Sequence, residues 1–132
     1  MTRLLLVGGW TRLYRKAKSR GLQVTVVEDP SELSAQDRAL VDDVIPLPID
    51  APGVVDAAER AHRRRPFDCV VSMRELGLDN AAAIRERLGI TGNPAGPVRR
   101  TRDKLAMRRH LVEARLPSVP FVALRRAPAY SR

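Results

Sequence analysis

The fold is decided by residues 3–27, which read RLLLVGGWTRLYRKAKSRGLQVTVV. Two runs of apolar and β-branched residues, at 3–7 and 22–27, are typical of short buried strands. Between them, Thr11 is placed to cap a helix over 12–20, and a glycine follows that helix where one commonly ends. A strand, a helix and a second strand in about 25 residues predict a parallel βαβ unit.

The same alternation continues to about residue 91. Further helices are predicted within 31–41, where Ser34 is cap-like, and over 52–65 and 77–88, with strands over 44–47 and 67–72. Pro46 and Pro48 confine the strand at 44–47 to a sheet edge. Residues 90–91 either begin a fifth strand or pack as a loop. The pattern predicts the α/β class, with an open, mostly parallel, Rossmann-like three-layer sheet.

The composition describes a small protein with an uneven charge. The chain has 132 residues, 44% of them hydrophobic, which suits one folded domain and argues against disorder. The net charge is +9, yet residues 1–96 hold 14 basic and 13 acidic side chains, whereas residues 97–132 hold 10 basic and 2 acidic. The basicity therefore belongs to the last segment, which we expect to bind polyanions without specificity.

Several classes of protein are excluded by simple features. No apolar run is long enough to cross a membrane, and no signal peptide is visible. The single cysteine, Cys69, excludes an internal disulfide, favours a cytoplasmic location and is expected to be a buried, inert thiol. His62 and His110 have no acidic or cysteine partner at ligand spacing, so no metal site is predicted. Nothing resembles a hydrolytic triad.

The chain changes character after residue 92. A turn-rich linker is predicted first, then an arginine-rich helix over 101–114 and a possible last strand over 121–124. The expected organisation is a Rossmann-like domain at 1–93, a basic linker and helix at 94–120, and a tail at 121–132.

Candidate binding residues follow the strands, because loop amides and helix N-termini converge at the carboxyl ends of a parallel sheet. Gly8 and Gly9 would admit a phosphate or carboxylate close to the backbone, or they simply make a tight turn. Arg74 could pair a substrate carboxylate and Glu75 could accept hydrogen bonds from a substrate amine. The alternative is that these two charged residues form a mutual or local surface ion pair. Glu28 lies 20 residues after Gly8, the spacing of a ribose-binding acid in dinucleotide folds, although the third glycine of that pattern is absent.

Residues 101–120 resemble a segment of the ATP-grasp superfamily. There, a motif of the form Asp-Lys-x-x-x-Arg, a short helix and a Leu-Pro-x-x-Pro turn join the N-terminal domain to the ATP-binding domains, and here the motif begins at Asp103-Lys104. Upstream, Val7-Gly8-Gly9, Val70-Val71-Ser72-x-x-Glu75 and Gly92-Asn93-Pro94 resemble the N-terminal pre-ATP-grasp domain of carboxylate–amine ligases and biotin carboxylase.

The resemblance implies an ATP-dependent ligase that forms an acyl phosphate and passes it to an amine. It implies that Lys104 contacts an ATP phosphate, that Gly8 and Gly9 lie beside a small carboxylate or amine substrate, and that Glu75 faces that substrate. The cofactors implied for the full ligase are ATP and Mg²⁺. The family's Mg²⁺ ligands and ATP lid come later than residue 132, and Arg115 stands where a glycine is usual.

These departures lead to the expectation that the chain is a truncated or divergent piece, inactive unless the missing ATP-grasp domain is supplied in cis or in trans. Two other functions stay open. One is a stand-alone Rossmann-like nucleotide-binding or dinucleotide-binding module that uses Glu28. The other is nucleic-acid binding by residues 97–132, although no aromatic residue lies between Pro97 and Pro120 to stack on bases.

Overall fold

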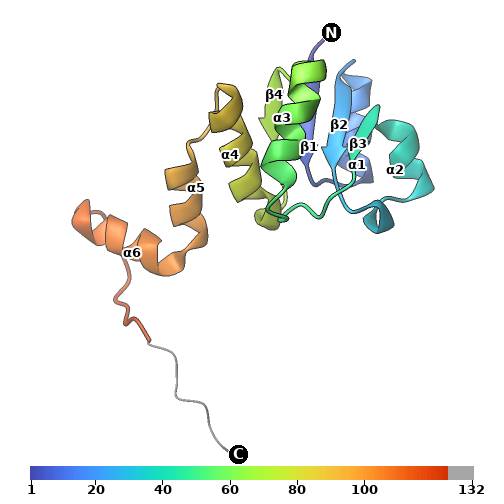
Figure 1. Ribbon diagram of the computed structural model, residues 1–132. Coiled ribbons are helices and arrows are strands. Elements are labelled where there is room, and N and C mark those ends of the chain that lie inside the picture. The colour runs from blue at the N-terminus through green and yellow to red at the C-terminus, as the bar shows by residue number, and fades with distance from the viewer. Residues whose placement is uncertain (125–132) are drawn as a thin grey trace, which may run out of the picture. The chain divides into compact units, whose positions relative to one another are not determined.

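The computed structural model describes residues 1–124. The chain divides into two compact units, 1–98 and 99–132 (Figure 1). The first unit contains β1 (Arg3–Val7), α1 (Thr11–Ser19), β2 (Gln23–Val27), α2 (Ala35–Leu40), β3 (Asp43–Ile45), α3 (Val54–Arg64), β4 (Cys69–Val71) and α4 (Leu78–Leu88). Short 3₁₀ turns are formed by Pro30–Glu32 and Glu75–Gly77. Helix α5 (Ala95–Arg102) extends across the division, and α6 (Lys104–Glu113) belongs to the second unit.

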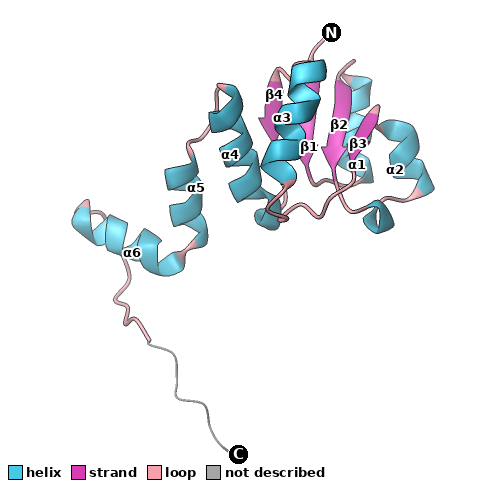
Figure 2. Cartoon of the chain, viewed as in Figure 1, coloured by secondary structure: helices cyan, strands magenta, loops and turns pink. Residues whose placement is uncertain are grey.

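The sheet of the first unit has four strands, all parallel, in the order β3-β2-β1-β4 (Figure 2). In the central strand, Leu5 lies opposite Thr25 on one side and Val70 on the other. Strand β3 is at the edge, which is where Pro46 and Pro48 were expected to confine it. The predicted open, parallel, Rossmann-like α/β fold is confirmed.

Each face of the sheet is covered by a pair of helices, so the unit has three layers. The side chains of β1 alternate between the faces, as a strand requires. Leu5 and Val7 pack with Val54 and Ala58 of α3 and with α4, whereas Leu4 and Leu6 pack against the other face with α1. Both faces are apolar because a parallel sheet is buried on both sides.

Several local predictions can be compared with the structure in the first unit. Ser34 caps α2 in a reciprocal capping box with Asp37, as its position suggested. Thr11 is not a cap, because Trp10 holds the N-cap position without a side-chain hydrogen bond and Thr11 is already the first helical residue. Cys69 is half-buried rather than buried, since it lies on the short edge strand β4. Ile90 is in a loop, so the alternative of a fifth strand is not realised.

The segment predicted as a linker contains a helix. Helix α5 begins at Ala95, whose amide donates to the Glu86 carboxylate at 2.7 Å, and Pro97 lies in its first turn. Proline is tolerated there because the first amides of a helix have no intrahelical acceptor. Arg85 also holds the loop by donating to the Asn93 carbonyl at 3.0 Å. The glycines and prolines that suggested a linker are thus compatible with a short helix tied to α4.

The second unit begins its main helix later than predicted. Helix α6 starts at Lys104 rather than Thr101, because the Asp103 carboxylate accepts from the amides of Leu105 and Ala106 and so caps it. Residues 121–124 form a loop rather than the possible last strand, and the rest of the predicted tail, 125–132, lies outside the described residues. Of the helices within residues 1–124, none has the length and apolar character that crossing a bilayer requires.

Candidate functional site

The strand order reverses beside β1. The chain passes from β1 to β2 and β3 on one side and then crosses to β4 on the other, so the switch point lies between β1 and β4. Open α/β sheets bind ligands beyond the carboxyl ends of the strands at such a point. The residues at this position are Gly8 and Gly9 after β1, and Ser72 to Glu75 after β4.

The Gly8-Gly9 turn is tightly enclosed. Gly8 has a φ of +75° and donates its amide to the Val27 carbonyl at 2.9 Å. A Cβ atom on Gly9 would lie 2.5 Å from Cε1 of the buried Tyr14 ring. Both glycines are therefore required by the backbone path and by packing, which gives weight to the tight-turn interpretation without excluding a ligand beside the loop.

Glu28 is a buried carboxylate that faces this turn. Its side chain is 5% exposed and pairs with Arg74, the Nη1 to Oε2 distance being 3.3 Å. Burial raises the pKa of the Glu28 carboxyl, while Arg74 and the backbone amides of Gly9 and Asp29 act in the opposite direction. The carboxylate thus links the ends of β1, β2 and β4.

The side chains of Arg74 and Glu75 have different surroundings, although the two residues are adjacent in sequence. Arg74 pairs with Glu28, and Ser72 anchors the loop because its hydroxyl donates to the Val7 carbonyl at 2.8 Å. Glu75 is exposed at the start of the 3₁₀ turn that precedes α4. The expected alternative of a mutual Arg74–Glu75 ion pair does not occur among residues 1–124, where Arg74 binds a partner distant in sequence.

Two further residues at this site were not singled out from the sequence. Burial and the charges of Glu28 and Asp37 raise the pKa of Tyr14, so its phenol stays protonated. The Ser34 hydroxyl, and to a smaller extent Thr11, lower the pKa of Asp37. The three-residue spacing from Ser34 to Asp37 is a capping-box signal that could have found this acid. Its position near Tyr14 depends on the packing of α1 on α2 and has no local signal.

The arrangement can hold an anion beside the Gly8-Gly9 turn. The Arg74 side chain is 40% exposed while Glu28 is covered, so the guanidinium keeps donors toward solvent. A guanidinium presents five donors in a planar fork that matches a carboxylate. Trp10, 45% exposed on the same loop, is available as an apolar neighbour. Glu75 adds an exposed acceptor after β4.

Lys104 lies in the second unit and is exposed. It was expected to lie one turn inside a helix whose N-terminus attracts phosphate. Instead, it is the first residue of α6, and the Asp103 carboxylate already accepts from two amides at that helix end. Lys104 thus lies at the helix terminus itself, directly after the capping residue, rather than one turn inside the helix.

The described residues do not form a metal centre. Within residues 1–124, no group of three or more His, Cys, Asp or Glu side chains could hold a metal ion. The resemblance implied Mg²⁺ for the full ligase, with its ligands later than residue 132. His62 has a structural contact, since its Nδ1 accepts from the Phe67 amide at 3.0 Å.

One comparison with known proteins identifies a family. The sequence profile of the ATP-grasp N-terminal domain matches residues 14–92. No curated protein matches the sequence.

Solved structures resemble the fold at low sequence identity. The L-amino acid ligase from Bacillus licheniformis has 21% identity and a TM-score of 0.74, with 92% of this chain and 36% of that chain covered. The phosphoribosylglycinamide synthetase from Anaerococcus prevotii has 20% identity and a TM-score of 0.72, with 86% of this chain and 29% of that chain covered. The biotin carboxylase domain of the 2-oxoglutarate carboxylase from Hydrogenobacter thermophilus has 19% identity and a TM-score of 0.68, with 90% of this chain and 28% of that chain covered. This chain thus spans about a third of the length of these structures.

Proposed function

Because the chain belongs to the ATP-grasp N-terminal domain family, we propose that it is the substrate-side domain of an ATP-dependent carboxylate–amine ligase. Such a ligase would activate a carboxylate as an acyl phosphate and pass the acyl group to an amine. The observation that carries the proposal is the convergence of Gly8, Gly9 and Arg74 at the switch point of the sheet.

Arg74 would bind the carboxylate of a small substrate through the donors that Glu28 does not use. Its other side is held by the ion pair with Glu28, so the guanidinium is positioned before any ligand arrives. The Gly8-Gly9 turn would allow close approach of the substrate, and Glu75 would accept hydrogen bonds from a substrate amine. The ion-pair geometry supports this role for Arg74, while the role of Glu75 rests on its exposed position after β4.

The rest of the ligase would be supplied by an ATP-grasp domain in cis or in trans. In this proposal, residues 1–93 form the substrate-side domain and residues 94–120 lead toward the ATP-binding part, with Lys104 contacting an ATP phosphate. ATP would supply the phosphoryl group that activates the carboxylate. Because residues 1–124 do not fit a Mg²⁺ centre, we assign no step to that ion here, and we expect the chain alone not to couple ATP. We place the protein in the cytoplasm, in keeping with its single free thiol.

A binding experiment with labelled protein tests the substrate role. Backbone amide spectra of the ¹⁵N-labelled full chain would be recorded with L-alanine and bicarbonate as probes. We expect at least one probe to shift the amides of Gly8, Gly9 and Glu75 at millimolar concentration. Arg74→Gln should weaken that binding about tenfold, which corresponds to losing one charged hydrogen bond worth about 1.4 kcal/mol.

Arg87→Gln is the matched control, because Arg87 is also a half-exposed arginine in an ion pair. Its partners are Glu59 and Asp56 of α3, which do not belong to the candidate site. It should leave probe binding unchanged. Equal weakening by both variants, or shifts confined to the basic second unit, would contradict the substrate role.

A dinucleotide-binding module is the second candidate, because Glu28 lies buried at the end of β2 at the position of a ribose-binding acid. However, the Glu28 carboxylate already accepts from Arg74, Gly9 and Asp29. Calorimetry with NAD⁺ separates the candidates: tight binding that Glu28→Gln abolishes would favour the second one over the ligase.

A further inference from the structure

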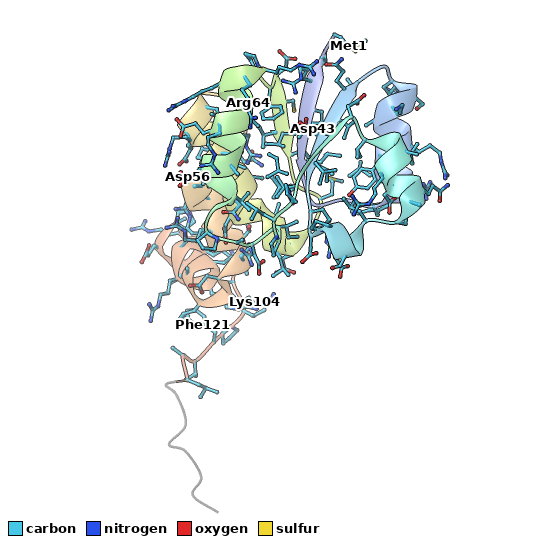
Figure 3. The ribbon with its side chains drawn as sticks, turned by 45° about the vertical axis from the view of Figure 1, so that its right-hand side comes forward. Met1, Asp43, Asp56, Arg64, Lys104 and Phe121 are labelled. Atoms are coloured by element: carbon cyan, nitrogen blue, oxygen red, sulfur yellow. The ribbon has the colours of Figure 1, made fainter. Side chains whose placement is uncertain are left out.

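A cavity lies in a groove between α3 and the edge strand β3, and its lining shares no residue with the candidate substrate site. Its volume is about 490 Å³, within the range of small-molecule sites. Arg3 begins β1 and Arg64 ends α3, so one end of the groove lies toward the amino ends of the strands. Ile45 and Pro46 line its other end, where β3 finishes. Figure 3 shows the labelled Asp43 and Arg64 at the same end of the unit as Met1.

The floor of this groove is apolar and its rim is basic. Ile45, Pro46 and Ala61 contribute to the floor, and Arg60, Arg64 and Arg65 contribute to the rim. Arg60, Arg64 and Arg65 are exposed, and the helix backbone of α3 places the first two one turn apart. A ligand in the groove would therefore meet apolar atoms below and guanidinium groups beside it.

The lining of the groove has a net positive charge, because four arginines and one acid contribute to it. The acid that lines the groove is Asp43, and its carboxylate accepts from the Val44 amide at 2.8 Å. Arg3, the fourth lining arginine, donates to the carbonyls of Arg65 and Pro66 rather than to a carboxylate. Neighbouring guanidinium groups repel one another, so bringing an anion into the groove relieves that repulsion.

Other arginines near α3 do form ion pairs with acids of that helix. Arg63 pairs with Glu59 at 2.9 Å, and Arg87 pairs with Glu59 at 3.0 Å and with Asp56 at 3.6 Å. In contrast, the ion pairs formed within residues 1–124 include none of the groove arginines. The acids of α3, Asp56 and Glu59, are thus paired with Arg63 and Arg87, and the arginines that line the groove are left without an acid partner among residues 1–124.

We propose that this groove is a binding site for a small organic anion with an apolar body, such as an aromatic or acyl carboxylate, phosphate or sulfonate. Arg60 and Arg64 hold the anionic group, because a guanidinium is weakly hydrated and its fork matches such groups. The apolar body covers Ile45 and Pro46. This site is separate from the proposed substrate site and does not depend on the ligase assignment.

An added peptide strand is a poorer occupant of the same groove. Strand β3 has three residues, and Pro46, which follows it, has no amide hydrogen to donate to a neighbouring strand. Strand addition depends on such main-chain hydrogen bonds. A small ligand needs none of them.

Three probes separate the two parts of the recognition: naphthalene-2-sulfonate has both an anionic group and an apolar body, 2-naphthalenemethanol has only the apolar body, and inorganic sulfate has only the charge. Each would be titrated into the ¹⁵N-labelled full chain. We expect naphthalene-2-sulfonate to bind at least tenfold more tightly than either other probe. The shifted amides should be those of Val44, Ile45, Ala57 and Ala61.

A charge-matched pair of double variants completes the test. Arg60→Ala with Arg64→Ala should weaken naphthalene-2-sulfonate binding at least tenfold, whereas Arg15→Ala with Arg63→Ala removes the same charge outside the groove and should change it less than twofold. These four side chains are exposed, so we expect both variants to fold. Equal weakening in the two variants, sulfate binding as tight as the sulfonate, or shifts confined to residues 99–124 would overturn the proposal.

Discussion

Arg74 forms an ion pair with Glu28, with 3.3 Å between Nη1 and Oε2, and so connects the ends of β4 and β2 across the end of β1 that lies between them. Gly8 follows β1 beneath this connection, and a Cβ atom placed on it would lie 3.0 Å from Cδ of Arg74. The ion pair and the glycine turn are therefore parts of one arrangement, and changes to either should affect the other.

Gly8→Ala should destabilise the first unit by about 2 kcal/mol. The new side chain would have to adopt a φ of +75°, and its Cβ would also lie 3.1 Å from Cδ1 of Ile49. The control is Gly21→Ala, because Gly21 has a φ of +71° but a Cβ atom placed on it would have no neighbour within 4 Å. That variant carries the backbone strain alone and should cost about 1 kcal/mol. Urea unfolding measures both; equal losses would mean that the contacts with Arg74 and Ile49 contribute nothing.

Glu28→Gln should alter how stability depends on pH. Burial raises the pKa of Glu28 above its ordinary value of 4.5, so the folded chain takes up this proton more readily than the unfolded chain. The free energy of unfolding contributed by Glu28 therefore falls as the pH rises from about 4.5 toward the raised folded value. Glutamine does not titrate, so the stability of the variant relative to the natural chain should increase between pH 4 and pH 7. A relative stability that is constant or decreases over this range would contradict the raised pKa.

Ser34→Ala should give the opposite dependence. The Ser34 hydroxyl lowers the pKa of Asp37 from its ordinary value of 3.8, so this contact stabilises the fold above that pH and is lost as the pH falls through the lowered value. The substitution removes the cap of α2 and should cost about 1 kcal/mol at pH 7 and less near pH 3. Ser19→Ala is the control, because the Ser19 hydroxyl donates to the Lys16 carbonyl rather than to an acid. A loss at Ser34 that is constant with pH would show that Asp37 is not the partner that matters.

The layered fold could be predicted from the sequence because its signals are local. Each signal acts within a few residues and agrees with the structure: the short apolar runs of the strands, the capping position of Ser34 and the prolines after β3. Helix α5 was missed because its proline and glycine usually indicate a linker. The contact that compensates them, from Ala95 to Glu86, depends on tertiary packing.

The candidate site was only partly predictable for the same reason. The glycine turn and Arg74 were identified because they directly follow strands. The partner of Arg74 was not identified, because Glu28 is 46 residues away in the sequence. The two side chains come together only in the folded sheet, where β2 and β4 lie on either side of β1. The adjacent residue Glu75 was the obvious partner in sequence, but it is exposed at the start of the next turn.

Arg115→Gly should stabilise the end of α6. Arg115 has a φ of +56°, and its amide donates to the Val112 carbonyl while the Leu116 amide donates to the Leu111 carbonyl. This is the Schellman arrangement that normally places glycine in the left-handed position. A side chain there costs roughly 1 kcal/mol, so glycine should slow amide exchange in the last turn of α6 by about fivefold.

Arg109→Gly is the matched control for Arg115→Gly, because Arg109 is also exposed but lies inside α6. The identical replacement should there cost about 1 kcal/mol and accelerate exchange, since glycine is a poor helix former in a helix interior. Opposite signs at the two positions would identify the left-handed backbone, rather than the lost arginine charge, as the cause. If both variants accelerate exchange, the Arg115 side chain must be stabilising the helix end more than its backbone strain disfavours it.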